Sequence, residues 1–142
     1  MKKALLFCTV LLASASLFAQ EKKAVDVVQF KEMTHDFGKI KQSSPVTYDF
    51  MFSNISEAPV VIESATPSCG CTTPVKPEAA IPKGGTNKIT AGFNAAAPGP
   101  FNKFITIKVA GIDVPLQLKI TGEVLTADAY TKYVDEKAKT KG

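Results

Sequence analysis

Alternation of apolar and polar residues predicts the strands of this chain. Over residues 46–53 the apolar side chains fall on one face and the polar side chains on the other, which is typical of a strand with one buried face. The same alternation predicts three further strands, over 88–93, 105–109 and 114–124. Two weaker candidates are a short β-branched run over 60–62 and a mixed run over 25–33.

Turn-forming residues separate these runs. Pro, Gly, Asn and Ser gather in the segments 38–45, 54–59, 97–100 and 111–113. Between the strands there is no helical segment long enough for a crossover, so we expect antiparallel sheets. The predicted fold is all-β, an immunoglobulin-like sandwich of about seven strands over residues 20–125. The charged tail, residues 126–142, is the one segment with a helical pattern.

The first 19 residues have the pattern of a secretory signal peptide. Two lysines precede an apolar run over 4–12 and a small-residue stretch that ends at Ala19. The apolar run is shorter than the roughly 20 residues that cross a bilayer. We therefore expect cleavage after Ala19, with Ala15 as the alternative, and no transmembrane segment in the mature chain. Cys8 lies too soon after Lys3 for a lipoprotein signal.

Charge argues against nucleic acid as a partner. Without the two lysines of the signal peptide, 15 lysines face 13 acidic residues, so the mature chain is nearly neutral. The sequence holds no arginine, although the arginine fork is the preferred group for phosphates and base edges. The exported chain is thus expected to meet an envelope protein or a glycan.

The two cysteines of the mature chain, Cys69 and Cys71, are its most reactive pair. They lie in the longest irregular stretch, residues 67–85, which is either a functional loop or conceals a short strand over 72–75. Cysteines two residues apart cannot cross-link distant parts of the fold. A disulfide between them requires the backbone to fold over, which Gly70 allows.

Three uses of this pair are open. The cysteines form a structural clip, or they make a strained and labile disulfide for thiol exchange, or they bind a soft ion such as Cu(I). His35, the one histidine of the sequence, could join such a metal site, because the strand toward Gly38 and the strand toward Pro67 are expected to end at the same pole. Apart from Cu(I), no cofactor is expected.

Other polar residues are candidates for binding and not for catalysis. The residues expected to make contacts from the loops are Gly70, Thr72 and Asp36. The pair Ser43-Ser44 lacks the Gly-x-Ser-x-Gly setting of a nucleophilic serine, so we do not expect an enzyme. The triplet Asn54-Ile55-Ser56 matches a glycosylation acceptor, but we interpret it as a turn.

A set of motifs along the chain matches a known family. The motifs are His35-Asp36-Phe37-Gly38-x-Ile40, Tyr48-x-Phe50-x-Phe52-x-Asn54, Pro59-Val60-x-Ile62, Ser68-Cys69-Gly70-Cys71-Thr72, Pro82-x-Gly84, Phe93 and Gly99-x-Phe101-x-Lys103. Together they resemble the exported bacterial family called domain of unknown function 1573, from about Val27 to Val124. Two turns depart from its pattern, Ser44-Pro45 and Ile55-Ser56-Glu57, and these departures concern the shape of loops and any binding by them, not the sandwich.

The resemblance implies an immunoglobulin-like sandwich akin to Hydin-type and major-sperm-protein-like domains. It also implies export in a Gram-negative bacterium, to the periplasm or cell surface, and no established activity. The first functional hypothesis is therefore a non-catalytic binding or structural module of the cell envelope. The alternatives are a Cu(I)-binding protein and a thiol–disulfide role for Cys69 and Cys71.

Overall fold

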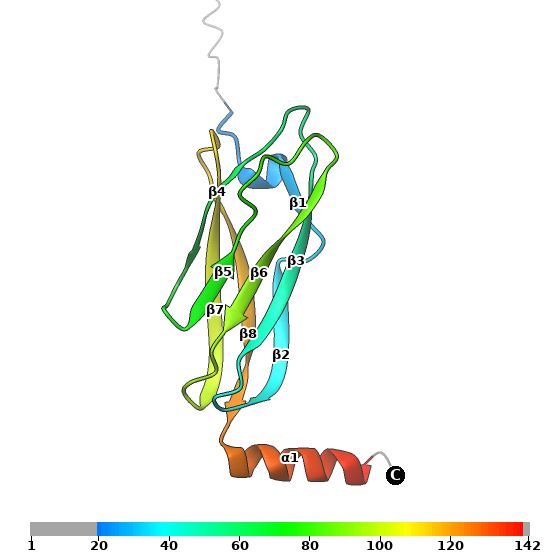
Figure 1. The fold of residues 1–142 in the computed structure, drawn as a ribbon, viewed down its shortest axis with the longest axis vertical. Helices are drawn as coiled ribbons and strands as arrows, with labels where there is room; N and C mark the ends of the chain where they lie inside the picture. The colour runs from blue at the N-terminus through cyan, green and yellow to red at the C-terminus, as the bar shows by residue number, and fades with distance from the viewer. Residues whose placement is uncertain (1–19, 141–142) are drawn as a thin grey trace, which may run out of the picture.

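The computed structural model describes residues 20–140, so the predicted signal peptide with its cleavage sites lies outside the described residues. Eight strands form two facing sheets of four, and a helix follows them (Figure 1). A 3-10 helix over Ala24–Asp26 precedes the first strand. The elements are β1 (Val28–Phe30), β2 (Thr34–Lys41), β3 (Val46–Asn54), β4 (Ile62–Pro67), β5 (Thr72–Val75), β6 (Thr86–Phe93), β7 (Gly99–Val109), β8 (Leu116–Leu125) and α1 (Ala127–Thr140).

The predicted sandwich is confirmed, with one strand pair that departs from the expectation. One sheet has the order β1-β3-β6-β5 and the other β2-β8-β7-β4. All pairs between these strands are antiparallel except β2 with β8, which run parallel. The exception arises because the first two strands belong to different sheets. β1 pairs with β3, and the chain then crosses to the other sheet, where β2 pairs with β8.

The core lies between the two sheets and uses the alternate positions that the pattern predicts. Apolar side chains from facing strands are fully buried there, among them Phe50, Ile89, Ile105, Ile107, Leu118 and Ile120. Burial of this apolar surface is the main favourable term in folding. The core also holds a buried polar side chain, Asn54, which is 1% exposed.

Asn54 organises a turn at the end of β3. Its Nδ2 donates to the carbonyl oxygens of Ala58 at 2.8 Å and Ile81 at 2.9 Å. Its Oδ1 accepts from the backbone N of Ser56 at 2.9 Å and from the Ser56 hydroxyl at 2.7 Å. The Asn54 amide is therefore fully hydrogen-bonded inside the protein, as expected of a turn residue and not of an exposed glycosylation acceptor.

The edge strand β2 extends into residues 38–45, a segment for which the sequence predicts a turn. It continues to Lys41, and its register with β8 shifts between Asp36 and Lys39. Gly38 lies in this bulge with φ 66°, a conformation that favours glycine. The Asp36 Oδ1 accepts from the Gly38 N at 2.9 Å. The predicted turn was wrong here because the glycine makes a bulge instead of ending the strand.

The helix α1 confirms the helical pattern of the tail. It lies across the end of the sandwich at which β8 finishes, as Figure 1 shows, and no residue of α1 is buried. Its first turn is joined to the preceding residue, because the Tyr130 N donates to the Thr126 carbonyl oxygen at 2.8 Å. No helix within residues 20–140 has the length and apolar character needed to cross a membrane.

Candidate functional site

The cysteine loop connects β4 to β5 at one edge of the sandwich (Figure 1). Cys69 and Cys71 form a disulfide with their Cα atoms 5.3 Å apart, within the range that this bond requires. The short strand considered for residues 72–75 is present as β5. Gly70 lies exposed between the two half-buried cysteines, and Ser68 before them is exposed as well.

Residues on both sides of the disulfide anchor the loop. The Ser68 N donates to the Phe104 carbonyl oxygen at 2.8 Å, and the Phe104 N donates to the Ser68 hydroxyl at 3.0 Å. Thr72 is 2% exposed, and its Oγ1 lies 3.8 Å from the Cys69 Sγ and 4.0 Å from the Cys71 Sγ. The Thr72 side chain therefore supports the disulfide from inside and is not on the loop surface.

Hydrogen bonds connect this loop to the loop 94–98, and that loop to residues 42–45, at the same end of the sandwich. The Asn94 N donates to the Cys71 carbonyl oxygen at 3.1 Å, and the Ser43 N donates to the Ala95 carbonyl oxygen at 2.8 Å. The Gln42 Nε2 reaches the Ala96 carbonyl oxygen at 3.0 Å. The three loops, residues 42–45, 68–71 and 94–98, thus form one connected surface, called here the disulfide pole.

A pocket of about 200 Å³ opens on the disulfide pole. Cys71 lines one side of it, and the stacked rings of Phe93 and Phe101, with centroids 4.1 Å apart, contribute apolar surface. Residues 94 and 96–100 complete the lining, and Lys103 contributes its one cation. Such a recess suits a small apolar group of a larger partner, with a polar contact at its margin.

His35 is not near the cysteines. β2 and β4 do run in the same direction, but they are the two opposite edges of their sheet, with β8 and β7 between them. His35 instead stacks on Tyr48 at 3.5 Å between ring centroids and meets the Phe37 ring edge-on at 4.7 Å. It joins β2 of one sheet to β3 of the other.

The three-residue metal site considered from sequence is therefore not formed. Within residues 20–140, no group of three or more His, Cys, Asp or Glu side chains is placed to hold a metal ion. Cysteines joined in a disulfide are not thiolate ligands. A metal role is thereby limited to the two thiolates of a reduced loop. Asp36 is likewise a structural residue of the β2 bulge, through its bond to Gly38.

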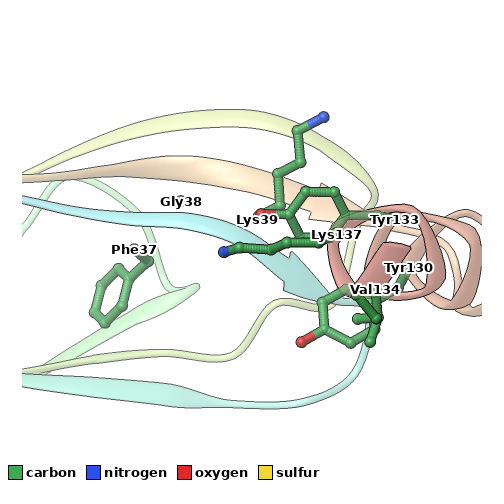
Figure 2. Close-up of a pocket in the computed structure, with 8 residues that line it drawn as sticks. Phe37, Gly38, Lys39, Tyr130, Tyr133, Val134 and Lys137 are labelled. Atoms are coloured by element: carbon green, nitrogen blue, oxygen red, sulfur yellow. The ribbon is translucent and has the colours of Figure 1, made fainter. Parts of the chain in front are cut away.

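A second concave region was not predicted. Figure 2 shows a groove between α1 and β2, with Tyr130, Tyr133 and Lys137 on the helix and Phe37, Gly38 and Lys39 on the strand. Its volume is about 470 Å³. The spacing of Tyr130 and Tyr133 was the available signal, but a helical pattern alone does not say which strand the helix lies against.

Comparisons with known proteins agree with this architecture. The model of a family described as protein of unknown function (DUF1573) matches residues 28–124. No curated protein is similar enough in sequence to count as a match.

Three solved structures share the fold. The ASH/PapD-like domain 7 of human CEP192 has 11% sequence identity and a TM-score of 0.58, and the match covers 71% of this chain and 87% of that domain. A protein of unknown function from Porphyromonas gingivalis W83 has 16% identity, a TM-score of 0.58 and coverages of 68% and 46%. The Vibrio cholerae VesB protease has 11% identity, a TM-score of 0.54 and coverages of 71% and 33%. The chain spans less than half of the two bacterial proteins, and identities this low establish the fold alone.

Proposed function

This chain belongs to the DUF1573 family, and from that premise we propose that it is an exported, non-catalytic immunoglobulin-like module that binds a protein or glycan of the cell envelope. The binding surface in this proposal is the disulfide pole. One observation carries it: the loop 94–98 is hydrogen-bonded to the cysteine loop on one side and to residues 42–45 on the other, and a pocket opens between it and Cys71. A surface ordered before binding loses less conformational entropy when a partner docks.

The chemistry of the pole supports binding over catalysis. The pocket lining includes one lysine and no acidic residue or histidine, so it offers no pair of groups for acid–base work. His35 lies between aromatic rings at the opposite edge of the sandwich. Loops at one end of a sandwich are also a common place for recognition.

Export is supported by two features of the chain. The first is the signal-peptide pattern of residues 1–19. The second is the Cys69–Cys71 disulfide, a bond that persists in oxidising compartments such as the periplasm.

Site-specific photo-crosslinking in living cells tests the proposed surface. A photoreactive residue replaces Ala97, which is exposed and lines the pole pocket. The matched control replaces Ala80, an exposed alanine next to Ile81, which pairs with Val60 before the first residue of β4 and therefore lies at the other end. We expect a discrete adduct from position 97 and none from position 80. Equal adducts from both positions, or none from position 97, would reject the disulfide pole as the binding surface.

A second candidate function is thiol–disulfide exchange, because the disulfide lies in a surface loop and Cys71 lines the pocket. In this reaction a partner thiolate attacks one sulfur of the pair, and the other sulfur leaves as a thiolate. A second partner thiolate then releases the mixed disulfide. The loop gains two electrons and becomes a dithiol, and the partner becomes a disulfide.

Trapping distinguishes this candidate from binding alone. In Cys71→Ser the Cys69 thiolate can attack the disulfide of an oxidised partner, which is the reverse of this reaction, and one partner sulfur leaves as a thiolate. Because no second loop cysteine is present to release the mixed disulfide, it should accumulate until a reductant is added. The double variant Cys69→Ser with Cys71→Ser is the control and should trap nothing. If Cys71→Ser yields no adduct beyond that control in non-reducing mass spectrometry of periplasmic protein, the exchange role is rejected, whereas the binding role stands.

A further inference from the structure

The hydroxyl of Thr72 is a buried polar group whose neighbours are the two disulfide sulfurs. Its Oγ1 lies 3.8 Å from the Cys69 Sγ and 4.0 Å from the Cys71 Sγ, and among residues 20–140 no nitrogen or oxygen atom makes a hydrogen bond with it. Buried hydroxyls are normally paired with a nitrogen or an oxygen. A disulfide sulfur is a weak acceptor and has no hydrogen to donate. The hydroxyl therefore lacks a strong partner while the loop is oxidised.

The strand β5 fixes the position of this hydroxyl. Thr72 is the first residue of β5 and pairs with Phe93 of β6. Its N donates to the Cys69 carbonyl oxygen at 3.3 Å, which closes the turn that holds Gly70. The side chain is enclosed and branched at Cβ, so few rotamers are open to it. We therefore expect the hydroxyl to stay beside the sulfur atoms when the bond between them opens.

Reduction of the loop gives the hydroxyl a strong partner. A thiolate is a charged acceptor, and hydrogen bonds to charged acceptors are roughly twice as strong as those between neutral groups. Both cysteines are half-buried, so a thiolate there has lost part of its hydration and gains from a donor of the protein. The hydroxyl thus stabilises the reduced loop more than the oxidised loop. A disulfide whose reduced form is stabilised is a stronger oxidant.

We propose that the Thr72 hydroxyl is a catalytic group of thiol–disulfide exchange at this loop and makes the loop an oxidant of protein dithiols. The inference rests on the exchange role proposed above and names the class of its partner. A partner thiolate attacks one loop sulfur, and the bond between Cys69 and Cys71 breaks with its electron pair on the other sulfur. The Thr72 hydroxyl donates a hydrogen bond to this leaving thiolate and keeps its own proton.

The second half of the reaction completes the balance. The second thiolate of the partner attacks the partner's sulfur in the mixed disulfide, which closes the partner's disulfide and releases the first loop sulfur as a thiolate. Two electrons have then passed from the partner to the loop. The hydroxyl can serve either leaving sulfur, because it lies at nearly the same distance from both.

Thr72→Val separates this role from a structural one. Valine keeps the branched shape of the side chain and suits a strand. Because the hydroxyl has only sulfur partners, its removal should not lower the free energy of unfolding of the oxidised protein. A hydroxyl that holds the fold together would show such a loss in denaturant unfolding, with no change in the chemistry of the disulfide.

Glutathione is the probe for the chemistry. The purified oxidised protein is mixed with reduced and oxidised glutathione, quenched with acid, alkylated and analysed by mass spectrometry. We expect the Cys69–Cys71 bond of Thr72→Val to be reduced at least about fivefold more slowly, and its equilibrium to shift at least about fivefold toward the disulfide. Thr72→Ser retains a hydroxyl and should remain close to the wild type. The matched control is Thr73→Val, at the next position of β5 and on its exposed face, and it should change neither value.

The proposal is overturned if Thr72→Val behaves as the wild type, if Thr73→Val has the same effect, or if Thr72→Ser behaves as Thr72→Val. The measurement needs no cellular partner, so it is independent of trapping with Cys71→Ser. A trapped adduct without an effect of Thr72→Val rejects the role of the hydroxyl and leaves the exchange role standing. An effect of Thr72→Val without a trapped adduct supports the role of the hydroxyl and rejects exchange in the cell.

Discussion

Asn54→Ala is expected to lower the free energy of unfolding by about 3 kcal/mol. The wild-type side chain is 1% exposed and makes four hydrogen bonds, two donated to the carbonyls of Ala58 and Ile81 and two accepted from Ser56. Alanine removes these bonds and leaves buried polar groups without partners. Denaturant unfolding followed by circular dichroism measures the change, read from the midpoint at constant slope.

Two further variants show whether the hydrogen bonds are the cause. Asn54→Asp keeps the shape but directs a buried carboxylate at two carbonyl oxygens, so it should cost at least as much. Asn87→Ala removes a partly exposed asparagine whose Oδ1 accepts only from the N of Lys88 within residues 20–140, and it should cost under about 1 kcal/mol. An Asn54→Ala protein as stable as Asn87→Ala would contradict this role for the Asn54 amide.

Gly122→Ala is expected to lower the free energy of unfolding by about 3 kcal/mol and to disturb the disulfide pole. A Cβ at Gly122 would lie 2.7 Å from the Phe101 Cζ and 2.8 Å from the Gly38 carbonyl oxygen. The Phe101 ring can shift only by leaving its stack on Phe93, and the Gly38 oxygen belongs to the backbone of the β2 bulge. Both movements change elements that support the pole or the groove.

The matched control is Gly111→Ala. Gly111 has φ 73°, and a Cβ there would meet no atom within 4 Å, so this variant carries the cost of backbone strain without a clash, about 1 kcal/mol. Denaturant midpoints give both costs, and crosslinking from position 97 reports on the pole. If the two variants lose equal stability, close packing against Gly122 is not what requires a glycine.

Most of the fold could be predicted because alternation records burial directly. The inner residues of β3, β6, β7 and β8 alternate with polar ones. The sequence therefore indicates both that these segments are strands and which of their side chains face the core. β2 was not indicated in this way, because its inward side chains, His35 and Phe37, are only half-buried, and the bulge at Gly38 shifts the alternation before Ile40. The run at 60–62 marked only the first residue of β4, since Val60 makes an isolated bridge to Ile81 and the strand continues from Ile62 to Pro67.

The site was predictable only where it is local in sequence. The Cys69–Cys71 bond depends on a spacing of two residues and on Gly70, both visible in the sequence. The position of His35 depends on which strands lie between β2 and β4, and the groove depends on where α1 packs. These positions depend on contacts between residues far apart in the chain. The alternation of apolar and polar residues in one sequence does not show which strands and helices lie side by side.

The claim on which the functional proposal rests is that the disulfide loop holds the pole loops in one ordered surface. Hydrogen exchange of the Asn94 amide tests it most directly, because this N–H donates to the Cys71 carbonyl oxygen at 3.1 Å. In the oxidised protein we expect slow exchange, and after reduction of Cys69–Cys71 we expect several-fold faster exchange, with β7 and β8 unchanged. Fast exchange in the oxidised protein, or the same rate in both forms, would contradict it.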